Sequence, residues 1–135
     1  DLFAGLGTFA LSLTGRTLAV EGEREAALAL KGAAQRGGRQ VFVDHRDLFQ
    51  RPLVAAELNR FEAVISDPPR AGAREQAALR APSAVPRIAS VSCNPATFAR
   101  DAKILVDGGY RLDWVQPVGQ FRWSTHVEVV GQFSR

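Results

Sequence analysis

The chain has 135 residues, 46% of them hydrophobic, which is enough for one domain with a buried core and too few for two ordinary domains. Its formal net charge of +3 permits a polyanionic partner without requiring one. A single cysteine excludes an internal disulfide framework, and with only His45 and His126 beside it we expect no metal site. No stretch approaches the roughly 18 apolar residues of a membrane span. We therefore expect a soluble protein of the reducing cytoplasm with no membrane partner.

In the first half of the chain, short apolar runs alternate with segments of helical periodicity. Residues 1–3 have the pattern of the end of a strand whose start is missing, so we expect a fragment of a longer protein. Ala and Leu at helical spacing in 23–35, followed by Gly37 and Gly38, predict a helix with a stop signal. The other predicted helices are 9–13 and 53–59, and the predicted strands are 17–20, 40–43 and 62–66.

The second half keeps this alternation and then departs from it. Helices are predicted at 74–80 and 97–106, with a strand at 87–92 between them. The runs 110–118 and 126–133 are strand-like, with no helix between them. Alternating strands and helices predict an α/β fold with a mostly parallel central sheet and helices on both faces. The closing pair predicts an antiparallel C-terminal strand at one edge of that sheet.

A glycine-bearing turn follows the first strand, in the segment DLFAGLGTF. Gly5 and Gly7 let the backbone approach a ligand without a Cβ in the way. Glu21 ends the next strand, where a carboxylate can accept from both ribose hydroxyls of a nucleoside, and Asp47 has the comparable place for an adenine edge. The GxGxxG fingerprint and the P-loop are both missing from the sequence, so a nucleoside cofactor without a pyrophosphate fits best. A solvated loop charge is the alternative for each acid.

Two prolines follow an acid at the end of the strand 62–66, in the sequence Asp67-Pro68-Pro69-Arg70. The fixed φ angles of proline make such a turn rigid, which would hold Asp67 and Arg70 over one crevice. An ordinary Pro-Pro loop is the alternative. It explains the prolines but not their position directly after an acid.

Aromatic and charged residues are interleaved in the segment FRWSTHVEVV. Phe121, Arg122 and Trp123 are candidate contacts to bases and phosphates, because aromatic stacking and arginine hold splayed bases. Aromatic residues before an edge strand are more commonly part of a core, and that alternative stays open. Strand alternation points Glu128 away from Val127 and Val129, either to solvent or into a cleft.

Cys93 stands in the segment VSCNPATF, directly after the predicted strand 87–92. The carboxyl ends of strands border the ligand crevice in open α/β sheets, so Cys93 is a candidate nucleophile. The alternative is that this lone cysteine is a small buried hydrophobic residue.

Four segments occur in the order and at the separations of a known family: DLFAGLGTF, the VEG of 20–22, DPPRAG at 67–72, and SCNPATFARD followed by STHVE. On the basis of these segments, the chain resembles over essentially its whole length the catalytic domain of the RNA uracil-5-methyltransferases. These enzymes use S-adenosylmethionine to form 5-methyluridine in tRNA and rRNA. SCNP with a downstream HVE is specific, whereas DLFAGLG and DPPR recur in methyltransferases generally. The resemblance implies a single Rossmann-like catalytic domain over 1–135, with RNA as its partner.

The resemblance also implies a role for several residues. Cys93 falls on the position of the family's nucleophile, and Glu128 falls on that of its general base. In this chemistry a thiolate adds to carbon 6 of uracil, the resulting enolate takes the methyl group, and the base removes the proton of carbon 5. The positions that match the family's cofactor contacts are Phe3, Thr8, Glu21, Asp47 and Asp67.

The chain departs from the family pattern at Thr8, where Asn is common, and at 119–122, where Asp-x-Phe-Pro is common. We expect both departures to tune contacts. Family members also carry upstream RNA-binding parts, in many cases an OB-like module and sometimes a cysteine-ligated iron–sulfur cluster, which this chain lacks. We therefore expect the isolated 135 residues to bind the cofactor weakly and to methylate RNA poorly.

Two other functions remain open. Amino-group methyltransferases of nucleic acids also use an Asp-Pro-Pro motif, usually followed by an aromatic residue. Arg70 at that position, together with Cys93 and Glu128, argues against this class. The second alternative is a non-catalytic module that binds RNA or a nucleoside and keeps only the fold.

Overall fold

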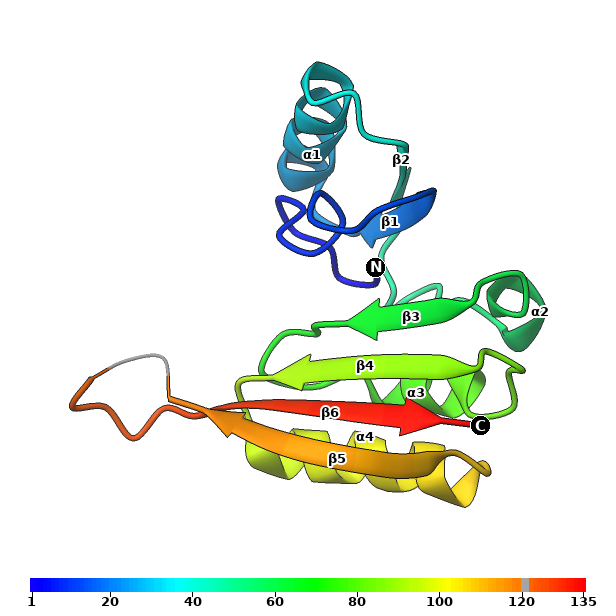
Figure 1. Ribbon diagram of the computed structural model, residues 1–135, viewed down its shortest axis with the longest axis vertical. Coiled ribbons are helices and arrows are strands. Elements are labelled where there is room, and N and C mark those ends of the chain that lie inside the picture. Colours follow the sequence, from blue (N-terminus) through cyan, green and yellow to red (C-terminus); the bar gives the residue numbers. More distant parts are fainter. Residues whose placement is uncertain (120–121) are drawn as a thin grey trace. The chain divides into compact units, whose positions relative to one another are not determined.

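The computed structural model describes residues 1–119 and 122–135 (Figure 1). Two compact units make up the chain, Asp1–Arg51 and Pro52–Arg135, and each has its own sheet. The expectation of one domain over 1–135 stays a prediction. In the described part of the chain, no helix is long and apolar enough to cross a membrane.

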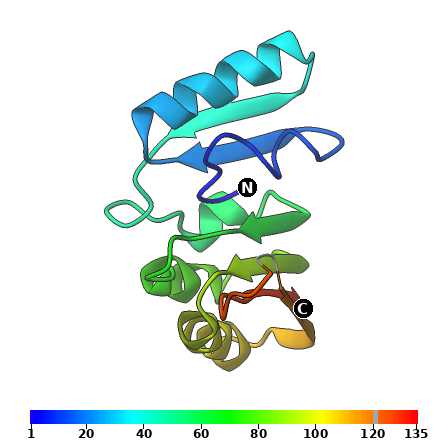
Figure 2. The same ribbon diagram turned by 90° about the vertical axis from the view of Figure 1, so that its left-hand side faces the viewer.

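The first unit is a parallel strand pair packed against one helix (Figure 2). Strand β1 (Thr17–Glu21) pairs with β2 (Val41–His45), and helix α1 (Arg24–Arg36) connects them. Leu2 forms a parallel bridge with Val20, as expected for the end of a strand. The buried apolar cluster of this unit contains Ala4, Ala10, Ala19 and Leu30.

Helix α1 begins and ends within one residue of its predicted bounds. The Glu23 carboxylate caps the first turn, because it accepts hydrogen bonds from the backbone N–H groups of Glu25 at 3.0 Å and Ala26 at 2.6 Å. Gly37 follows the last turn. The buried side chains recur at helical spacing, so one face of α1 packs on the strands. They are Ala27, Leu30 and Ala34.

The predicted helix at 9–13 is wrong, because this segment forms consecutive turns instead. Leu11 N–H donates to the Gly7 carbonyl at 2.9 Å, and Leu13 N–H donates to the Phe9 carbonyl at 3.1 Å. Gly7, with φ +96°, and Gly15, with φ +88°, bracket the segment. The few residues between these glycines cannot offset the cost of nucleating a helix.

The second unit contains a four-stranded sheet with the order β3-β4-β6-β5 (Figure 1). Strand β3 (Ala63–Ser66), which follows the short helix α2 (Ala55–Leu58), is parallel to β4 (Arg87–Ser92). Strand β6 (Glu128–Ser134) runs antiparallel to both β4 and β5 (Arg111–Val118). All four strands lie within two residues of their predicted positions.

Strand β6 is antiparallel as predicted, but its predicted position at the sheet edge is wrong. It lies between β4 and β5, and β5 forms the edge. Val129, Gly131 and Phe133 on β6 are buried, whereas most side chains of β5 are exposed. The strand with a buried face therefore takes the interior position, and the solvated strand closes the sheet.

Two helices lie side by side on one face of this sheet, α3 (Arg74–Arg80) and α4 (Pro95–Asp107) (Figure 2). Phe98 of α4 packs against β6, with its ring centroid 6.4 Å from that of Phe133. Gly131 makes this approach possible, because a Cβ there would lie 2.5 Å from the Phe98 ring. Helix α4 is thereby fixed on the central strands.

Candidate active site

Glu21, the last residue of β1, holds the glycine turn with its carboxylate. Oε2 accepts a hydrogen bond from Gly5 N–H at 2.7 Å, and Oε1 accepts one from Glu23 N–H at 2.7 Å. A carboxylate has about four lone-pair positions, so acceptor capacity is left for hydroxyl donors. Glu21 can therefore bind the turn and a ribose diol at the same time.

The two glycines of the turn have different structural roles. Both have positive φ, +54° at Gly5 and +96° at Gly7. A Cβ on Gly7 would overlap Cδ1 of Leu30, so the absence of a side chain lets the turn pack on α1. A Cβ on Gly5 would meet nothing within 4 Å. Of the two, only Gly5 keeps backbone open to a ligand, with the exposed Thr8 on the same turn.

Asp47 and two aromatic rings lie just past β2. Asp47 Oδ1 accepts from Phe49 N–H at 2.8 Å and from Gln50 N–H at 3.4 Å, which orders the turn. The Phe49 ring lies against Phe3, with centroids 5.5 Å apart. Phe3 itself has φ +61°, an uncommon conformation for a residue with a Cβ and one that clusters at functional sites. Sequence reasoning missed Phe49, whose only signal is an aromatic residue after a strand.

The ends of β1 and β2 bring these side chains together. Arg46 N–H donates to the Glu21 carbonyl at 2.9 Å, and a Cβ on Gly22 would lie 3.2 Å from Cα of Asp47. The first unit therefore gathers most of the predicted cofactor residues at the carboxyl ends of its two strands. These residues are Phe3, Gly5, Glu21 and Asp47.

In the second unit, Asp67 directly follows β3 and is half-buried. Burial raises the pKa of its carboxyl above the usual range, and the negative charge of Glu128 raises this pKa further. Strand β4 lies between β3 and β6 in the sheet. The two acids therefore flank the strand that leads to Cys93.

The register of β4 and β6 relates Cys93 to Glu128. Ser92 pairs with Val129 in this antiparallel ladder. Cys93 follows Ser92 and Glu128 precedes Val129, so these two residues are the next positions beyond the last β4–β6 pair. Both are half-buried. The structure thus places the predicted nucleophile and the predicted base at the same end of neighbouring strands.

Hydrogen bonds order the backbone on both sides of Cys93. The Ser92 hydroxyl donates to the Asn94 carbonyl at 3.1 Å and accepts from Asn94 N–H at 3.1 Å. Asn94 Oδ1 caps α4 by accepting from Ala96 N–H at 3.0 Å. Cys93 therefore sits in a tight strand-to-helix connection that limits where its sulfur can lie.

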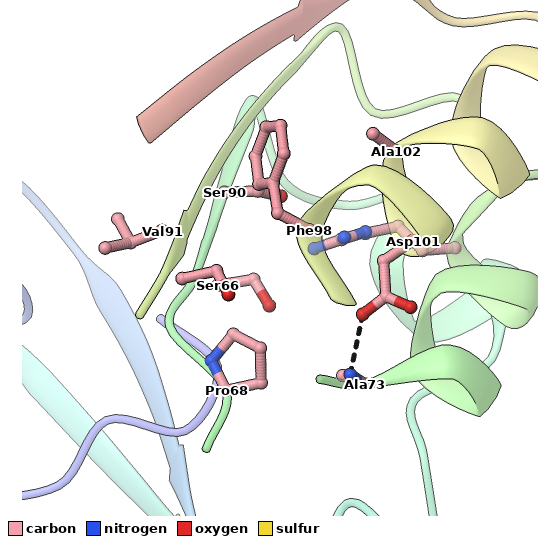
Figure 3. A pocket seen from close by; sticks show the side chains of 10 residues that line it. Ser66, Pro68, Ala73, Ser90, Val91, Phe98, Asp101 and Ala102 are labelled. Atoms are coloured by element: carbon pink, nitrogen blue, oxygen red, sulfur yellow. Dashed lines mark hydrogen bonds between the residues drawn. The ribbon is translucent and has the colours of Figure 1, made fainter. Parts of the chain in front are cut away.

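A cavity of about 20 Å³ lies under the Asp-Pro-Pro turn, with Ser66 and Pro68 on one side and Asp101 on the other (Figure 3). It has room for about one water molecule, and is too small for a nucleoside or a base. Arg80 also lines it, and among the described residues its Nε and Nη1 atoms have no hydrogen-bond partner. Burial lowers the pKa of Arg80 to about 10, against the opposing influence of Asp101 and Tyr110, so the guanidinium stays charged at neutral pH.

The predicted RNA contacts have exposed side chains where the structure describes them. Arg70 and Arg122 are exposed, and Trp123 is 99% exposed with φ +65°. Phe121 lies outside the described residues. A fully exposed tryptophan is not part of a core, so for Trp123 the core alternative is wrong.

Comparison with known proteins identifies the family. The family model described as tRNA (Uracil-5-)-methyltransferase matches residues 39–134, well over half of the chain. The chain belongs to this family. Its Cys93, Glu128 and Asp67 all lie inside the matched segment.

Relatives with similar sequences are RNA methyltransferases by name. An uncharacterised RNA methyltransferase of Zymomonas mobilis is 62% identical over all of this chain and 34% of its own length. One from Rhizobium meliloti is 52% identical over all of this chain and 34% of its own length. The 23S rRNA (uracil(1939)-C(5))-methyltransferase RlmD of Acinetobacter baylyi is 40% identical over all of this chain and 31% of its own length. The chain thus spans about a third of the length of these relatives.

Solved structures confirm the Rossmann-like methyltransferase fold. The tRNA (uracil-54, C5)-methyltransferase of Pyrococcus abyssi, in complex with S-adenosyl-L-homocysteine, matches with a TM-score of 0.85 and 27% identity, over 98% of this chain and 33% of that one. Magnesium protoporphyrin IX methyltransferase of Synechocystis matches with a TM-score of 0.75 and 16% identity, over 100% of this chain and 68% of that one. The second likeness concerns the fold alone.

Proposed function

We propose that the full-length protein transfers a methyl group from S-adenosylmethionine to carbon 5 of a uridine in tRNA or rRNA, through a covalent adduct with Cys93. The register of β4 and β6 carries this proposal, because it makes Cys93 and Glu128 neighbours at the end of the sheet. The named activities of RlmD and of the Pyrococcus abyssi enzyme support uracil carbon 5 as the target.

The first unit has the chemistry that the cofactor needs. Glu21 keeps acceptor positions for the two ribose hydroxyls, and Gly5 leaves open space above the turn. When bound, S-adenosylmethionine supplies an electrophilic methyl group. The residues proposed to hold it are Phe3, Gly5, Gly7, Thr8, Glu21 and Asp47, with Asp67 of the second unit as a further predicted contact.

Cys93 and Glu128 have different roles in this reaction. Cys93 adds to the uracil ring, and Glu128 removes a proton from it. The Cys93 thiolate forms a bond to carbon 6 of uracil, and the electron pair of the carbon 5–carbon 6 double bond moves onto the carbon-4 carbonyl as an enolate. Carbon 5 of this enolate takes the methyl group. The Glu128 carboxylate then accepts the proton of carbon 5, the double bond re-forms, and the sulfur leaves as a thiolate. Uracil has gained one methyl group and lost one proton.

Exposed cationic and aromatic side chains suit an RNA substrate. Arg70 and Arg122 can contact phosphates, and the exposed ring of Trp123 can stack on an unpaired base. We propose these three residues, with Phe121, as substrate contacts. Such contacts are sequence-tolerant, so they fit the holding of a flipped uridine better than the selection of one RNA.

The test uses the full-length protein, after S-adenosylmethionine binding has been confirmed by calorimetry. The protein is mixed with total tRNA and rRNA fragments that carry 5-fluorouridine, and intact mass is measured with and without S-adenosylmethionine. Fluorine cannot leave as a proton, so methylation through a thiolate adduct stops with RNA attached. Peptide mapping locates the attachment, and a Cys93→Ser variant is the matched control.

A cofactor-dependent adduct on Cys93, absent in Cys93→Ser, supports the proposal. Which RNA pool is captured distinguishes tRNA from rRNA. Methylation of an RNA amino group by a protein that forms no adduct would overturn it in favour of the amino-group methyltransferase. Cofactor binding without any methyl transfer to either pool would favour the non-catalytic module.

A further inference from the structure

We propose that Thr97, Arg100 and Asp101 are positioning residues, which hold the segment after the Asp-Pro-Pro turn against α4 and so set where Asp67 lies relative to Cys93. This inference rests on the proposed function. These three residues lie within the segment SCNPATFARD, in which the resemblance assigns a role to Cys93 alone.

Side chains on one face of α4 form hydrogen bonds with the backbone of residues 70–73. Arg100 Nη2 donates to the Ala71 carbonyl at 3.0 Å, and Asp101 Oδ2 accepts from Ala73 N–H at 2.7 Å. Arg100 Nε and Asp101 Oδ1 are joined at 2.8 Å, so the two side chains act as one unit. Figure 3 shows Asp101 reaching from α4 to Ala73.

The Arg70 carbonyl is held at the start of the same segment. The Thr97 hydroxyl lies 3.3 Å from this oxygen and 3.1 Å from the Asn94 carbonyl, and its single proton is shared between the two acceptors. Asn94 Nδ2 donates to the Arg70 carbonyl at 3.4 Å. Asn94 also caps α4 and directly follows Cys93. Its side chain therefore links the connection that carries the nucleophile to the segment that follows Asp67.

Gly72 shows that this contact is built for close approach. Its φ is +75°, and a Cβ there would lie 2.5 Å from Arg100 Nη2, 2.7 Å from Asp101 Oδ2 and 3.0 Å from Thr97 Cβ. The three proposed residues thus surround the one position in the segment that has no side chain. A surface loop that rests loosely on a helix has no need of such a glycine.

The buried positive charge of Arg80 also helps to hold Asp101 in place. The Asp101 carboxyl is 14% exposed, and its negative charge acts on the buried guanidinium of Arg80. A buried charge is costly unless it is paired, so this attraction favours an inward position of Asp101. The carboxylate thus accepts from Ala73 N–H and lines the same cavity as Arg80.

The contact between α4 and residues 70–73 affects the positions of Asp67 and Cys93 and not their chemical groups. Asp67 is fixed by the rigid prolines to a segment that α4 holds, and Cys93 directly precedes Asn94, the N-cap residue of the same helix. Misplacing reacting groups by about 1 Å can cost roughly a hundredfold in rate. Releasing the segment should therefore slow adduct formation without removing any group that touches uracil.

The experiment measures three quantities in the full-length protein. They are the single-turnover rate of the Cys93 adduct with 5-fluorouridine RNA, the thermal midpoint, and the hydrogen-exchange rate of the peptide that contains Ala73. The variants are Arg100→Ala, Arg100→Lys and Asp101→Asn, with Lys103→Ala as the matched control. Lys103 lies on α4 and pairs with Asp107 in solvent, 2.8 Å away, outside the contact with 70–73.

We expect Arg100→Ala to slow adduct formation by roughly 10- to 100-fold and to speed exchange at Ala73, while its thermal midpoint stays near that of Lys103→Ala. Arg100→Lys, which can still donate to the Ala71 carbonyl, should recover most of the rate. Asp101→Asn should speed exchange and slow the adduct, because it weakens the attraction to Arg80. Wild-type adduct rates in Arg100→Ala, or equal losses in Arg100→Ala and Lys103→Ala, would overturn the inference. No adduct in the wild type would instead overturn the proposed function.

Discussion

The carboxylate of Glu128 raises the pKa of the Asp67 carboxyl, although the two residues belong to strands that are separated by β4. Cys93 follows that intervening strand. Two acids that repel one another thus stand on either side of the predicted nucleophile. Their repulsion is a cost to the folded state while both are ionised.

Replacing Glu128 by Gln should lower the pKa of Asp67 towards its usual range. The variant removes the negative charge and keeps the shape of the side chain, so only the contribution of burial remains. The measurement is a pH titration of the Asp67 carboxyl carbon by NMR in wild type and variant. An unchanged Asp67 pKa would show that the charges of the two groups do not interact.

Asp67→Asn should stabilise the fold at neutral pH. The folded-state pKa of Asp67 is raised, so between the usual carboxyl pKa and the raised value the folded protein binds more protons than the unfolded chain. Stability therefore falls as pH rises through that window, and Asn removes this loss. Urea unfolding at pH 3.5 and pH 7 should show a larger gain for Asn at pH 7. A gain that is equal at both pH values would contradict the assignment.

Glu128→Gln should also trap the reaction on ordinary RNA. Gln cannot accept the proton of carbon 5, so the thioether to Cys93 forms and the methyl group is transferred, but elimination is slow. Intact mass should show a methylated RNA adduct with unfluorinated substrate, which wild type releases. Quantitative turnover by this variant would assign the proton removal to another group.

Gly7→Ala should destabilise the first unit far more than Gly5→Ala. Both positions have positive φ, which costs a residue with a Cβ roughly 1–2 kcal/mol. At Gly7 the new methyl group also overlaps Leu30, and such overpacking adds about 1–3 kcal/mol. Denaturant unfolding of the two variants separates these contributions, since Gly5 has open space. Similar losses at both positions would mean that the turn relaxes away from α1.

Glu21→Gln should weaken S-adenosylhomocysteine binding by roughly tenfold, the effect expected from losing a charge-assisted hydrogen bond. The amide group also cannot accept from both Gly5 and Glu23, so one of these bonds is lost. Glu23→Gln is a matched control, because Glu23 likewise accepts from two backbone N–H groups, of Glu25 and Ala26. Calorimetry should show weakened binding only in the Glu21 variant. Equal weakening in both would assign the effect to turn stability.

Local periodicity and stop signals predicted most elements well. The bounds of α3 and β4 agree with their predictions to the residue, and α1 differs by one residue at each end. The turns at 9–13 were missed because apolar spacing alone does not register the left-handed glycines on either side. Periodicity also orders strands along the chain but says nothing of their order in a sheet, which is why β6 was expected at the edge.

The candidate site was predictable where chemistry resides in single residues. Cys93, Glu128 and the acids at strand ends could be named from position and residue type. Two contacts could not be predicted, because each depends on residues brought together by folding. They are the contact of Phe49 with Phe3 and the hydrogen bonds from α4 to residues 70–73. Arg80 gave no signal at all, since an arginine at the end of a helix is normally solvated.

Strand β6 is synthesised after β4 and β5, the two strands between which it lies in the sheet. On a ribosome, β4 and β5 emerge first and have no hydrogen bonds to one another to form. Only when 128–134 leaves the exit tunnel can the sheet close, and the same event delivers Glu128 to Cys93. A nascent chain therefore carries Cys93 before Glu128, and the two residues become neighbours only when β6 adds to β4.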